Sequence, residues 1–341
     1  MSLLARVRDC QFACRAAHNA RRMSPPAPLY PPASLHQCAA AALLVRPAAF
    51  GYNPQTAVTN RFQLPGRRTQ AEARDALAEF DALVAALRAA GLRLCVADDT
   101  PAPVKPDALF PNNWLSFHAD GSLVLYPLAT RNRRQERRPD LIAAACESLG
   151  FVVRRRIDLT AQEAQGKFLE GTGSLVLDHR ARLAYANRSV RTEDSLVREW
   201  CRLMDYEPVL FDAATPDGTP VYHTNVLLWI GESLCGIGSQ WIAAADRERV
   251  LTRLADSGRT VLDLPERALL RFAGNMLELA RPAAAGGGRV LVMSATAADA
   301  LTPAQHDVLR AGTGQVVVAA VPTIERLGGG SVRCMLAEVP A

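Results

Sequence analysis

The feature that most constrains the fold of this chain is a recurring order of elements, strand–turn–strand–helix–strand, found about five times between Ala40 and Val339. The copies share this order without sharing sequence. Residues 113–128 and 221–238 show the hairpin part most clearly, because apolar and polar residues alternate around Asp120-Gly121 and Gly231-Glu232. A supersecondary unit repeated in this way indicates pseudo-symmetric assembly around an axis.

Helices separate the hairpins. The clearest covers Thr69 to Gly91, where apolar residues recur at helical spacing, with Thr69 as N-cap and Gly91 as the stop. Further helices are predicted over 139–150, 195–204, 245–258 and 302–312, the last being the final helix of the chain. A doubly wound sheet would give one strand per helix, and the sequence has neither a GxGxxG nor a GxxxxGK[ST] phosphate loop. We therefore expect an α/β fold of repeated modules whose loops form a site at one mouth of the axis.

Composition and charge narrow the possible functions. Hydrophobic residues make up 49% of the chain and charged residues 21%, as in ordinary globular proteins. The net charge of +5 is small, and we interpret the arginine-rich runs 131–138 and 154–156 as solvated segments rather than as a nucleic-acid surface. No apolar run approaches the roughly 20 residues of a membrane span. Nucleic-acid and membrane partners are therefore not expected.

The cysteines favour reduced thiols in a cytoplasmic protein. They lie at positions 10, 14, 38, 95, 146, 201, 235 and 334, none with CxxC spacing, and no histidine or cysteine pair completes a zinc site with Cys10 and Cys14. A chain of 341 residues folds without disulfides. We expect no metal and no cofactor, with Cys95, Cys146, Cys201 and Cys235 in the core.

Residues 1–38 differ from the rest of the chain. They hold five arginines and one acidic residue, followed by a proline-rich stretch, and lack the long apolar core of a secretory signal. We interpret them as a disordered tail, or as the product of a start codon placed upstream of Met23. Residues 39–341 are then expected to form a single catalytic domain.

Four segments place polar or titratable residues at unusual points. They are DALFPNNW with Asp107 and Asn113, KFLEGTGSLVLD with Glu170, TPVYHTNVLLWIG with His223 and Asn225, and GGGSVRCMLAEV with Cys334. Taken singly, each has a structural interpretation: a core histidine within a strand, a turn acid, turn asparagines, a buried thiol. Taken together they match a cysteine hydrolase, in which a thiolate attacks, a histidine transfers protons and a carboxylate orients the histidine.

These segments, together with NPQTAVTNRFQ and YANRSVRTE, resemble the guanidine-modifying (amidinotransferase-like, pentein) superfamily over about Leu43 to Val339. That superfamily contains arginine deiminases, dimethylarginine dimethylaminohydrolases and amidinotransferases, and the resemblance is greatest to citrulline-utilisation hydrolases. It implies a five-bladed α/β propeller of five pseudo-symmetric ββαβ modules, in agreement with the repeat count.

The resemblance also implies roles for individual residues. Cys334 falls on the nucleophile, His223 on the catalytic histidine and Glu170 on its carboxylate partner. Asp107 falls on an acid that anchors the substrate's N–H groups. Arg191 lies where deiminases hold the substrate α-carboxylate with a guanidinium fork, although a surface arginine is the alternative. The glycines before Cys334 are expected to form a mobile loop over the substrate, and Arg333 to favour the thiolate.

Two departures from the family pattern concern the substrate. Deiminases hold a cationic guanidinium between two aspartates, whereas this chain has Asn113 and Asn225 at those places. A buried carboxylate is stable only with a positive partner. An amide offers both a donor and an acceptor, which suits a neutral ureido group.

We therefore expect a hydrolase that converts L-citrulline to L-ornithine, carbon dioxide and ammonia. The alternatives are a deiminase or amidine hydrolase acting on arginine or dimethylarginine, and a non-catalytic pentein. The last is disfavoured because nucleophile, histidine and acid are all present. The expected partner is an amino-acid substrate. The sequence does not define the oligomeric state, so a homodimer remains an option.

Overall fold

The computed structural model describes residues 36–66 and 69–340. The tail expected over residues 1–38 falls mostly on residues 1–35, which lie outside the described residues. Gln37 and Cys38 are buried, however, and Gln37 Nε2 donates to the carbonyl oxygen of Leu177 at 2.9 Å. Ordered structure thus begins before the expected residue 39, and Ser34–Ala341 form one compact unit.

The strands are short, and all of them belong to three-stranded sheets. They are β1 (Ala41–Arg46), β2 (Arg93–Asp98), β3 (Leu115–Phe117), β4 (Ser122–Leu125), β5 (Arg155–Asp158), β6 (Val176–Asp178), β7 (Leu183–Asn187), β8 (Glu207–Phe211), β9 (Leu228–Ile230), β10 (Leu234–Ile237), β11 (Thr260–Asp263), β12 (Leu277–Ala280), β13 (Arg289–Ser294), β14 (Gln315–Ala319) and β15 (Ala337–Val339).

The helices comprise long outer helices and short turns. The α-helices are α1 (Pro54–Ala57), α2 (Gln70–Ala89), α3 (Pro139–Leu149), α4 (Gly171–Ser174), α5 (Asp194–Met204), α6 (Ala244–Ala255), α7 (Glu266–Leu269), α8 (Ala295–Ala300), α9 (Pro303–Thr313) and α10 (Pro322–Gly328). The 3₁₀ turns are η1 (Pro111–Asn113), η2 (Arg133–Glu136), η3 (Thr160–Gln165), η4 (Thr224–Val226), η5 (Ser239–Trp241), η6 (Ala283–Ala285) and η7 (Val332–Met335).

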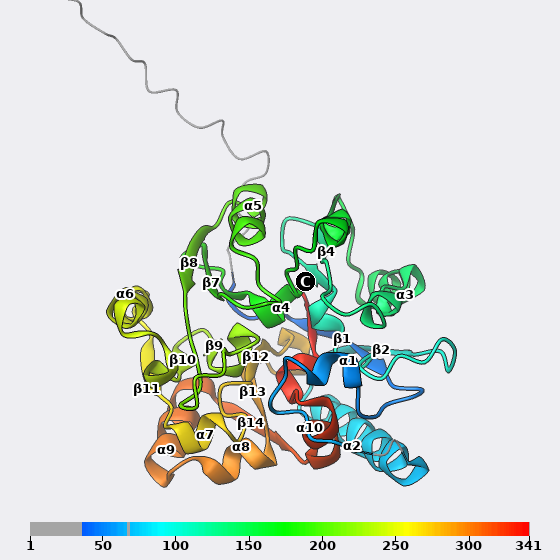
Figure 1. Ribbon diagram of the computed structural model, residues 1–341. Coiled ribbons are helices and arrows are strands. Elements are labelled where there is room, and N and C mark those ends of the chain that lie inside the picture. The colour runs from blue at the N-terminus through cyan, green and yellow to red at the C-terminus, as the bar shows by residue number, and fades with distance from the viewer. Residues whose placement is uncertain (1–35, 67–68, 341) are drawn as a thin grey trace, which may run out of the picture. The chain divides into compact units, whose positions relative to one another are not determined.

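The expected modules are confirmed. The strands form five sheets with the orders β15-β1-β2, β3-β4-β5, β6-β7-β8, β9-β10-β11 and β12-β13-β14. In each sheet the first two strands are antiparallel and the third is parallel to the second. A parallel pair needs a crossover connection, which α2, α3, α5, α6 and α9 supply. These helices lie outside the sheets, while α4 lies near the centre (Figure 1).

The two ends of the described chain meet in the first module. Leu43 of β1 pairs with Ala337 of β15 on one side and with Cys95 of β2 on the other. The first strands of neighbouring modules also contact one another, β15 with β3 and β6 with β9. The C-terminal strand therefore closes the ring, and the segment before it is directed towards the centre.

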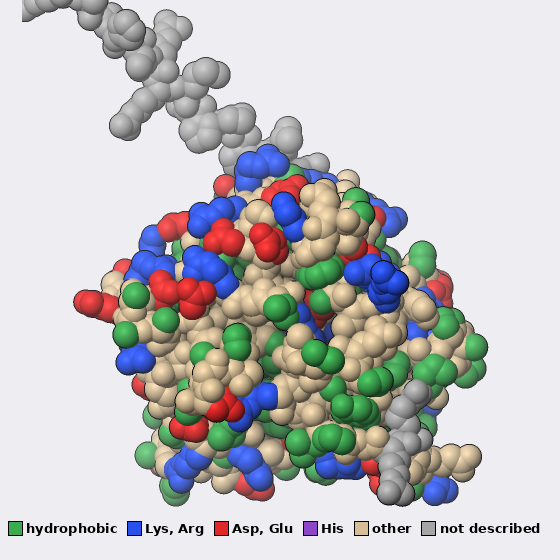
Figure 2. Space-filling model, in the orientation of Figure 1, with side chains coloured by type: hydrophobic (Ala, Val, Ile, Leu, Met, Phe, Trp, Pro, Cys, Tyr) green, Lys and Arg blue, Asp and Glu red, His purple; other side chains and the backbone are tan. Residues whose placement is uncertain are grey.

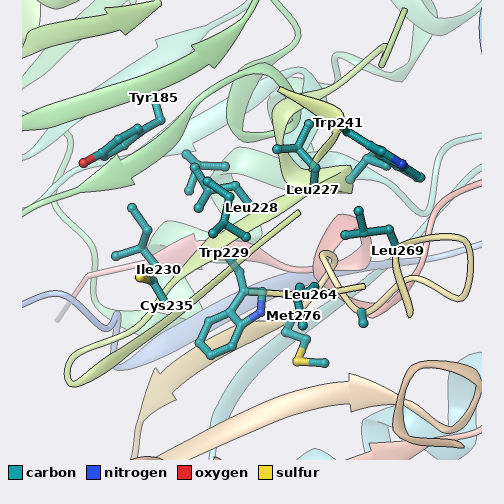
Figure 3. Packing of buried hydrophobic residues seen from close by; sticks show 14 of the residues in the cluster. Tyr185, Leu227, Leu228, Trp229, Ile230, Cys235, Trp241, Leu264, Leu269 and Met276 are labelled. Atoms are coloured by element: carbon teal, nitrogen blue, oxygen red, sulfur yellow. The ribbon is translucent and has the colours of Figure 1, made fainter. Parts of the chain in front are cut away.

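Apolar packing continues from one module into the next. In Figure 3, Tyr185 of β7, Trp229 of β9 and Cys235 of β10 lie in one cluster with Leu269 and Met276 of the following module.

The helix predicted from Thr69 is observed as α2. Thr69 and Glu72 form a capping box, and Phe80, Leu83 and Leu87 of α2 are buried at helical spacing.

The prediction that residues 302–312 form the final helix was wrong. The helix over 302–312, observed as α9, is followed by another, α10, which begins with Pro322 and ends at Gly329 in the left-handed region (φ 61°). Proline at the first turn and glycine just past the end are ordinary helix boundaries.

In the described part of the chain, no helix is both long and apolar enough to cross a membrane. Acidic and basic side chains are interspersed on the face seen in Figure 2.

Candidate active site

Five of the sequence-predicted residues lie on turns that directly precede the first strand of a module. Asn113 ends η1, Glu170 precedes α4, His223 precedes η4, and Cys334 lies in η7. His223 was expected inside an apolar strand but lies in the turn before β9. These turns converge, because α4 contacts both η1 and η4, and η1 contacts η7.

A narrow pocket opens where the turns meet. The space between its atoms, including the open mouth, is about 280 Å³. Its lining contains Asp107, Asn113, Arg191, His223 and Cys334 from the predicted set, together with Arg133, Thr56, Asn60, Phe110, Tyr222, Gly328 and Gly330.

His223 and Glu170 form a buried pair. His223 Nε2 lies 2.9 Å from Glu170 Oε2. Since the carboxylate accepts, Nε2 carries the proton and Nδ1 is left unprotonated. Burial, reinforced by Arg191 and Arg133, lowers the pKa of His223 to about 4 despite the opposing effect of Glu170. Burial by itself raises the pKa of Glu170, but Arg191, His223 and Arg133 together lower it. At neutral pH the pair is therefore a carboxylate and a neutral imidazole able to accept a proton at Nδ1.

Gly173 explains the glycine-rich turn that follows Glu170. A Cβ atom built on Gly173 would lie 2.5 Å from Asn113 Nδ2 and 2.7 Å from His223 Nδ1. Only glycine allows α4 to approach both side chains this closely. The position thus brings the Asn113 amide and the imidazole together.

Two side-chain amides approach the sulfur of Cys334. Asn225 Nδ2 lies 3.5 Å and Asn275 Nδ2 3.3 Å from its sulfur. Amide N–H groups directed at sulfur stabilise negative charge there. Asn225 was predicted to bind the substrate, yet it contacts the sulfur. Asn275 was not identified from the sequence.

Arg133 corrects the interpretation of residues 131–138 as a solvated segment. Its side chain is 2% exposed and forms a two-point ion pair with Glu136, with Nε–Oε1 at 3.0 Å and Nη2–Oε2 at 2.9 Å. Its Nη1 donates to Asn113 Oδ1 at 2.7 Å. Arginine has no acceptor, so this contact fixes the Asn113 amide with Oδ1 towards Arg133 and Nδ2 away from it.

Asp107 lies on the other side of Arg133. Its Oδ2 accepts from Asn53 Nδ2 at 2.7 Å and from Thr56 Oγ1 at 3.1 Å. Within the described residues, Asp107 Oδ1 and Asn113 Nδ2 are buried without a hydrogen-bond partner. Burial raises the pKa of Asp107, whereas Arg133 and the two donors oppose this. The pocket thus holds an unpaired acceptor, Asp107 Oδ1, and an unpaired donor, Asn113 Nδ2, besides the unprotonated His223 Nδ1.

Arg191 lies in the pocket, but its guanidinium is already engaged. It donates to Glu170 Oε2 at 3.4 Å, to the Thr56 carbonyl oxygen at 2.8 Å and to Thr59 Oγ1 at 2.6 Å. The alternative of a surface arginine is wrong, because the residue is 2% exposed. Binding of an α-carboxylate by its remaining N–H stays a prediction.

The segment before Cys334 is packed rather than loose. Asn60 Nδ2 donates to the Gly329 carbonyl oxygen at 3.1 Å, and residues Gly328 to Cys334 are all buried. Arg333 does not face the sulfur, since its Nη2 donates to Glu338 Oε2 at 2.7 Å. In this conformation the segment is packed, and Arg333 pairs with Glu338 rather than with the sulfur. Movement of the segment during substrate binding stays a prediction. The described residues contain no cluster of three His, Cys, Asp or Glu side chains able to hold a metal ion.

The chain is similar to a known protein family and to several solved structures. Residues 46–341 match a family model described as N,N dimethylarginine dimethylhydrolase, eukaryotic. No curated protein sequence matches. Among solved structures, the fold is similar to apo ArgZ, an arginine dihydrolase from the ornithine–ammonia cycle in Cyanobacteria, with 16% identity and a TM-score of 0.67 over 88% of this chain. The chain spans only 40% of that full-length protein.

Two further structures match nearly from end to end. The N-terminal domain of ArgZ, in a cysteine-to-serine mutant bound to substrate, has 16% identity and a TM-score of 0.66, covering 88% of this chain and 98% of that one. A cysteine-to-serine mutant of DDAH from Pseudomonas aeruginosa, complexed with citrulline, has 12% identity and a TM-score of 0.61, covering 88% and 99%. These likenesses show the expected pentein fold of five α/β modules.

Proposed function

Because the chain belongs to the N,N-dimethylarginine dimethylhydrolase family, we propose that it is a cysteine hydrolase of a guanidino or ureido amino acid, with the ureido group of L-citrulline preferred. The family places the chain among pentein amidine and guanidino hydrolases. The preference for a ureido group is the finer proposal, and it rests on one observation, the fixed orientation of the Asn113 amide.

Asn113 presents a donor, and only a donor, to the pocket. Its Oδ1 is held by Arg133 Nη1 at 2.7 Å, and its Nδ2 has no partner within the described residues. A guanidinium group has N–H donors and no acceptor, so it leaves Nδ2 unmatched. A ureido group has a carbonyl oxygen for Nδ2 and N–H groups for the unpaired Asp107 Oδ1.

The reaction follows from these contacts. Cys334 sulfur bonds to the ureido carbon, and the carbonyl oxygen becomes an oxyanion that Asn113 Nδ2 stabilises. His223 Nδ1 takes up a proton and delivers it to the departing nitrogen, so that one C–N bond breaks and a carbonyl group stays on sulfur. His223 then activates water, which breaks the C–S bond and releases a carbamate. The carbamate loses carbon dioxide, and this breaks the second C–N bond. The sum is citrulline plus water giving ornithine, carbon dioxide and ammonia.

Arginine or dimethylarginine hydrolysis is the second candidate, supported by the family match and by the relatives described as an arginine dihydrolase and a DDAH. Asp107 Oδ1 would accept from a guanidinium N–H as well as from a ureido N–H. The Asn113 donor would then meet the carbonyl oxygen that forms when the guanidinium is hydrolysed.

The test is incubation of the purified protein with citrulline, arginine and asymmetric dimethylarginine, with ornithine, citrulline, ammonia and dimethylamine measured. The proposal expects turnover of citrulline to exceed that of both cations. Arginine turnover well above citrulline turnover would refute the ureido preference. Cys334→Ser with normal activity would refute the cysteine mechanism, and Cys201→Ser, at a buried thiol in α5, is the matched control.

A further inference from the structure

The turns at the centre of the ring share a sequence pattern that identifies one more residue. A buried leucine stands two positions after a residue directed at the site in each of the five modules, as Asn113-Trp-Leu115, Gly173-Ser-Leu175, Asn225-Val-Leu227, Asn275-Met-Leu277 and Cys334-Met-Leu336. The proposed nucleophile Cys334 and Asn275 therefore occupy equivalent positions, in the turns before β15 and β12 respectively.

The geometry of Asn275 is fixed by its own contacts. Its side chain is 2% exposed, and Nδ2 donates to the backbone oxygen of Asn225 at 3.0 Å. A carbonyl only accepts, so the nitrogen must face this side. The same Nδ2 lies 3.3 Å from the Cys334 sulfur and directs its second N–H at it, while Asn275 Oδ1, at 3.7 Å, accepts from the protonated thiol. The turn that carries Asn275 includes Phe272 in the left-handed region (φ 64°), a strained backbone for a bulky residue.

We propose that Asn275 is a positioning residue that, together with Asn225, holds the Cys334 sulfur and stabilises its negative charge before attack. The inference rests on the proposed cysteine mechanism but not on the identity of the substrate. The amide of Asn225 approaches the same sulfur at 3.5 Å. The ionisable groups that share the pocket with Cys334 are Asp107, Arg133, Arg191, Tyr222 and His223. None of these forms a hydrogen bond to the sulfur within the described residues, so the two amides are its nearest polar support.

A purely structural role is the alternative, since Asn275 also ties its turn to Asn225. The two roles differ in what a variant changes. A tie between turns affects stability and the packing of η4. A donor to sulfur affects the reactivity of Cys334 at a given pH, whatever the substrate.

The experiment measures alkylation of Cys334 by iodoacetamide from pH 6 to 10, by mass spectrometry of its peptide, in Asn275→Ala and Asn275→Asp. Losing one hydrogen bond to a charged group should slow alkylation at neutral pH about tenfold and move the profile about one pH unit upward. Asn275→Asp should slow it further, because a carboxylate repels the thiolate. With the preferred substrate, the kcat of both Asn275 variants should fall, while their KM should change by less than about threefold.

Gln37→Ala is the matched control. Gln37 is a buried amide whose Nε2 donates to the Leu177 carbonyl oxygen at 2.9 Å, and it does not line the pocket, so its variant should lower the melting temperature and leave the alkylation profile unchanged. A folded Asn275→Ala protein that alkylates like the wild type at every pH would overturn the inference. Loss of the proposed function would appear differently, as full activity in Cys334→Ser.

Discussion

Asn113→Asp is the substitution that most directly tests the proposed substrate. It replaces the unpaired Nδ2 donor by an oxygen and leaves the other oxygen within reach of Arg133 Nη1, which lies 2.7 Å from Asn113 Oδ1 in the wild type. The new carboxylate would be partly neutralised by Arg133. Towards the pocket it would present lone pairs, which repel a carbonyl oxygen and attract guanidinium N–H groups.

The size of the effect is set by the hydrogen bond between Asn113 Nδ2 and the ureido oxygen, which the variant cannot make. One hydrogen bond is worth about 1 kcal/mol, and a buried polar group facing the wrong partner costs a further 1–3 kcal/mol or so. A total of about 3 kcal/mol corresponds to roughly a hundredfold fall in kcat/KM for citrulline. For arginine, a gain of about tenfold is expected, because Arg133 already offsets much of the added charge. The ratio of the two kcat/KM values should thus change by about a thousandfold.

The assay compares kcat/KM for citrulline and arginine in the wild type, Asn113→Asp and Asn113→Ala. The alanine variant removes the donor without adding charge, so it should lose citrulline activity without gaining arginine activity. Asn112→Ala is the matched control, because Asn112 is buried next to Asn113 but does not line the pocket. Citrulline activity within threefold of the wild type in Asn113→Asp would refute the donor argument.

Two further predictions concern the same centre. Gly173→Ala places a Cβ 2.5 Å from Asn113 Nδ2 and 2.7 Å from His223 Nδ1, so kcat should fall at least about a hundredfold. Gly166 also has a left-handed backbone (φ 70°), but a Cβ there would meet no other atom. Gly166→Ala should therefore lower the thermal stability and leave kcat unchanged. Because burial lowers the pKa of His223 to about 4 from 6.5, the unfolded chain takes up a proton in that window and the folded chain does not. His223 should therefore contribute up to about 3 kcal/mol to the fall in stability from pH 6.5 to 4 in urea unfolding. His223→Gln should lose less stability than the wild type over this range, and its remaining loss should come from His118, whose pKa burial also lowers, to about 3.

The order of elements could be predicted because its causes are local. Alternating hydrophobicity, a turn glycine such as Gly121 and a capping box such as Thr69 with Glu72 act within a few residues of one another. The position of His223 was less well predicted, since a single 3₁₀ turn before a three-residue strand has too few residues to establish a period. The missed helix α10 had boundary signals, Pro322 and Gly329, but only seven residues.

Arg133 and Asn275 could not be assigned for a different reason. Arg133 stands in a run of charges, which ordinarily indicates solvent, and its burial depends on Glu136 and on Asn113 of another turn. Asn275 has no unusual local sequence, and its contact with Cys334 joins two modules. The leucine two residues after a central-turn residue, which is asparagine in three of the five modules, was visible in the sequence. Its meaning depends on the ring that brings these turns to one centre.

Ring closure links the nucleophile to the stability of a single strand. Cys334 lies directly before β15, and Val339 of β15 is fully buried opposite Ala41 of β1. Val339→Ala leaves a cavity worth on the order of 2 kcal/mol, as does Val209→Ala at a comparably buried site in β8. If β15 opens locally, Val339→Ala should lose activity several degrees below its global melting temperature, whereas Val209→Ala should lose activity and structure together. Activity and circular dichroism followed on the same heating ramp make the comparison. Coincident transitions in both variants would show that the closing strand unfolds only with the whole ring, and that the nucleophile has no separate source of instability.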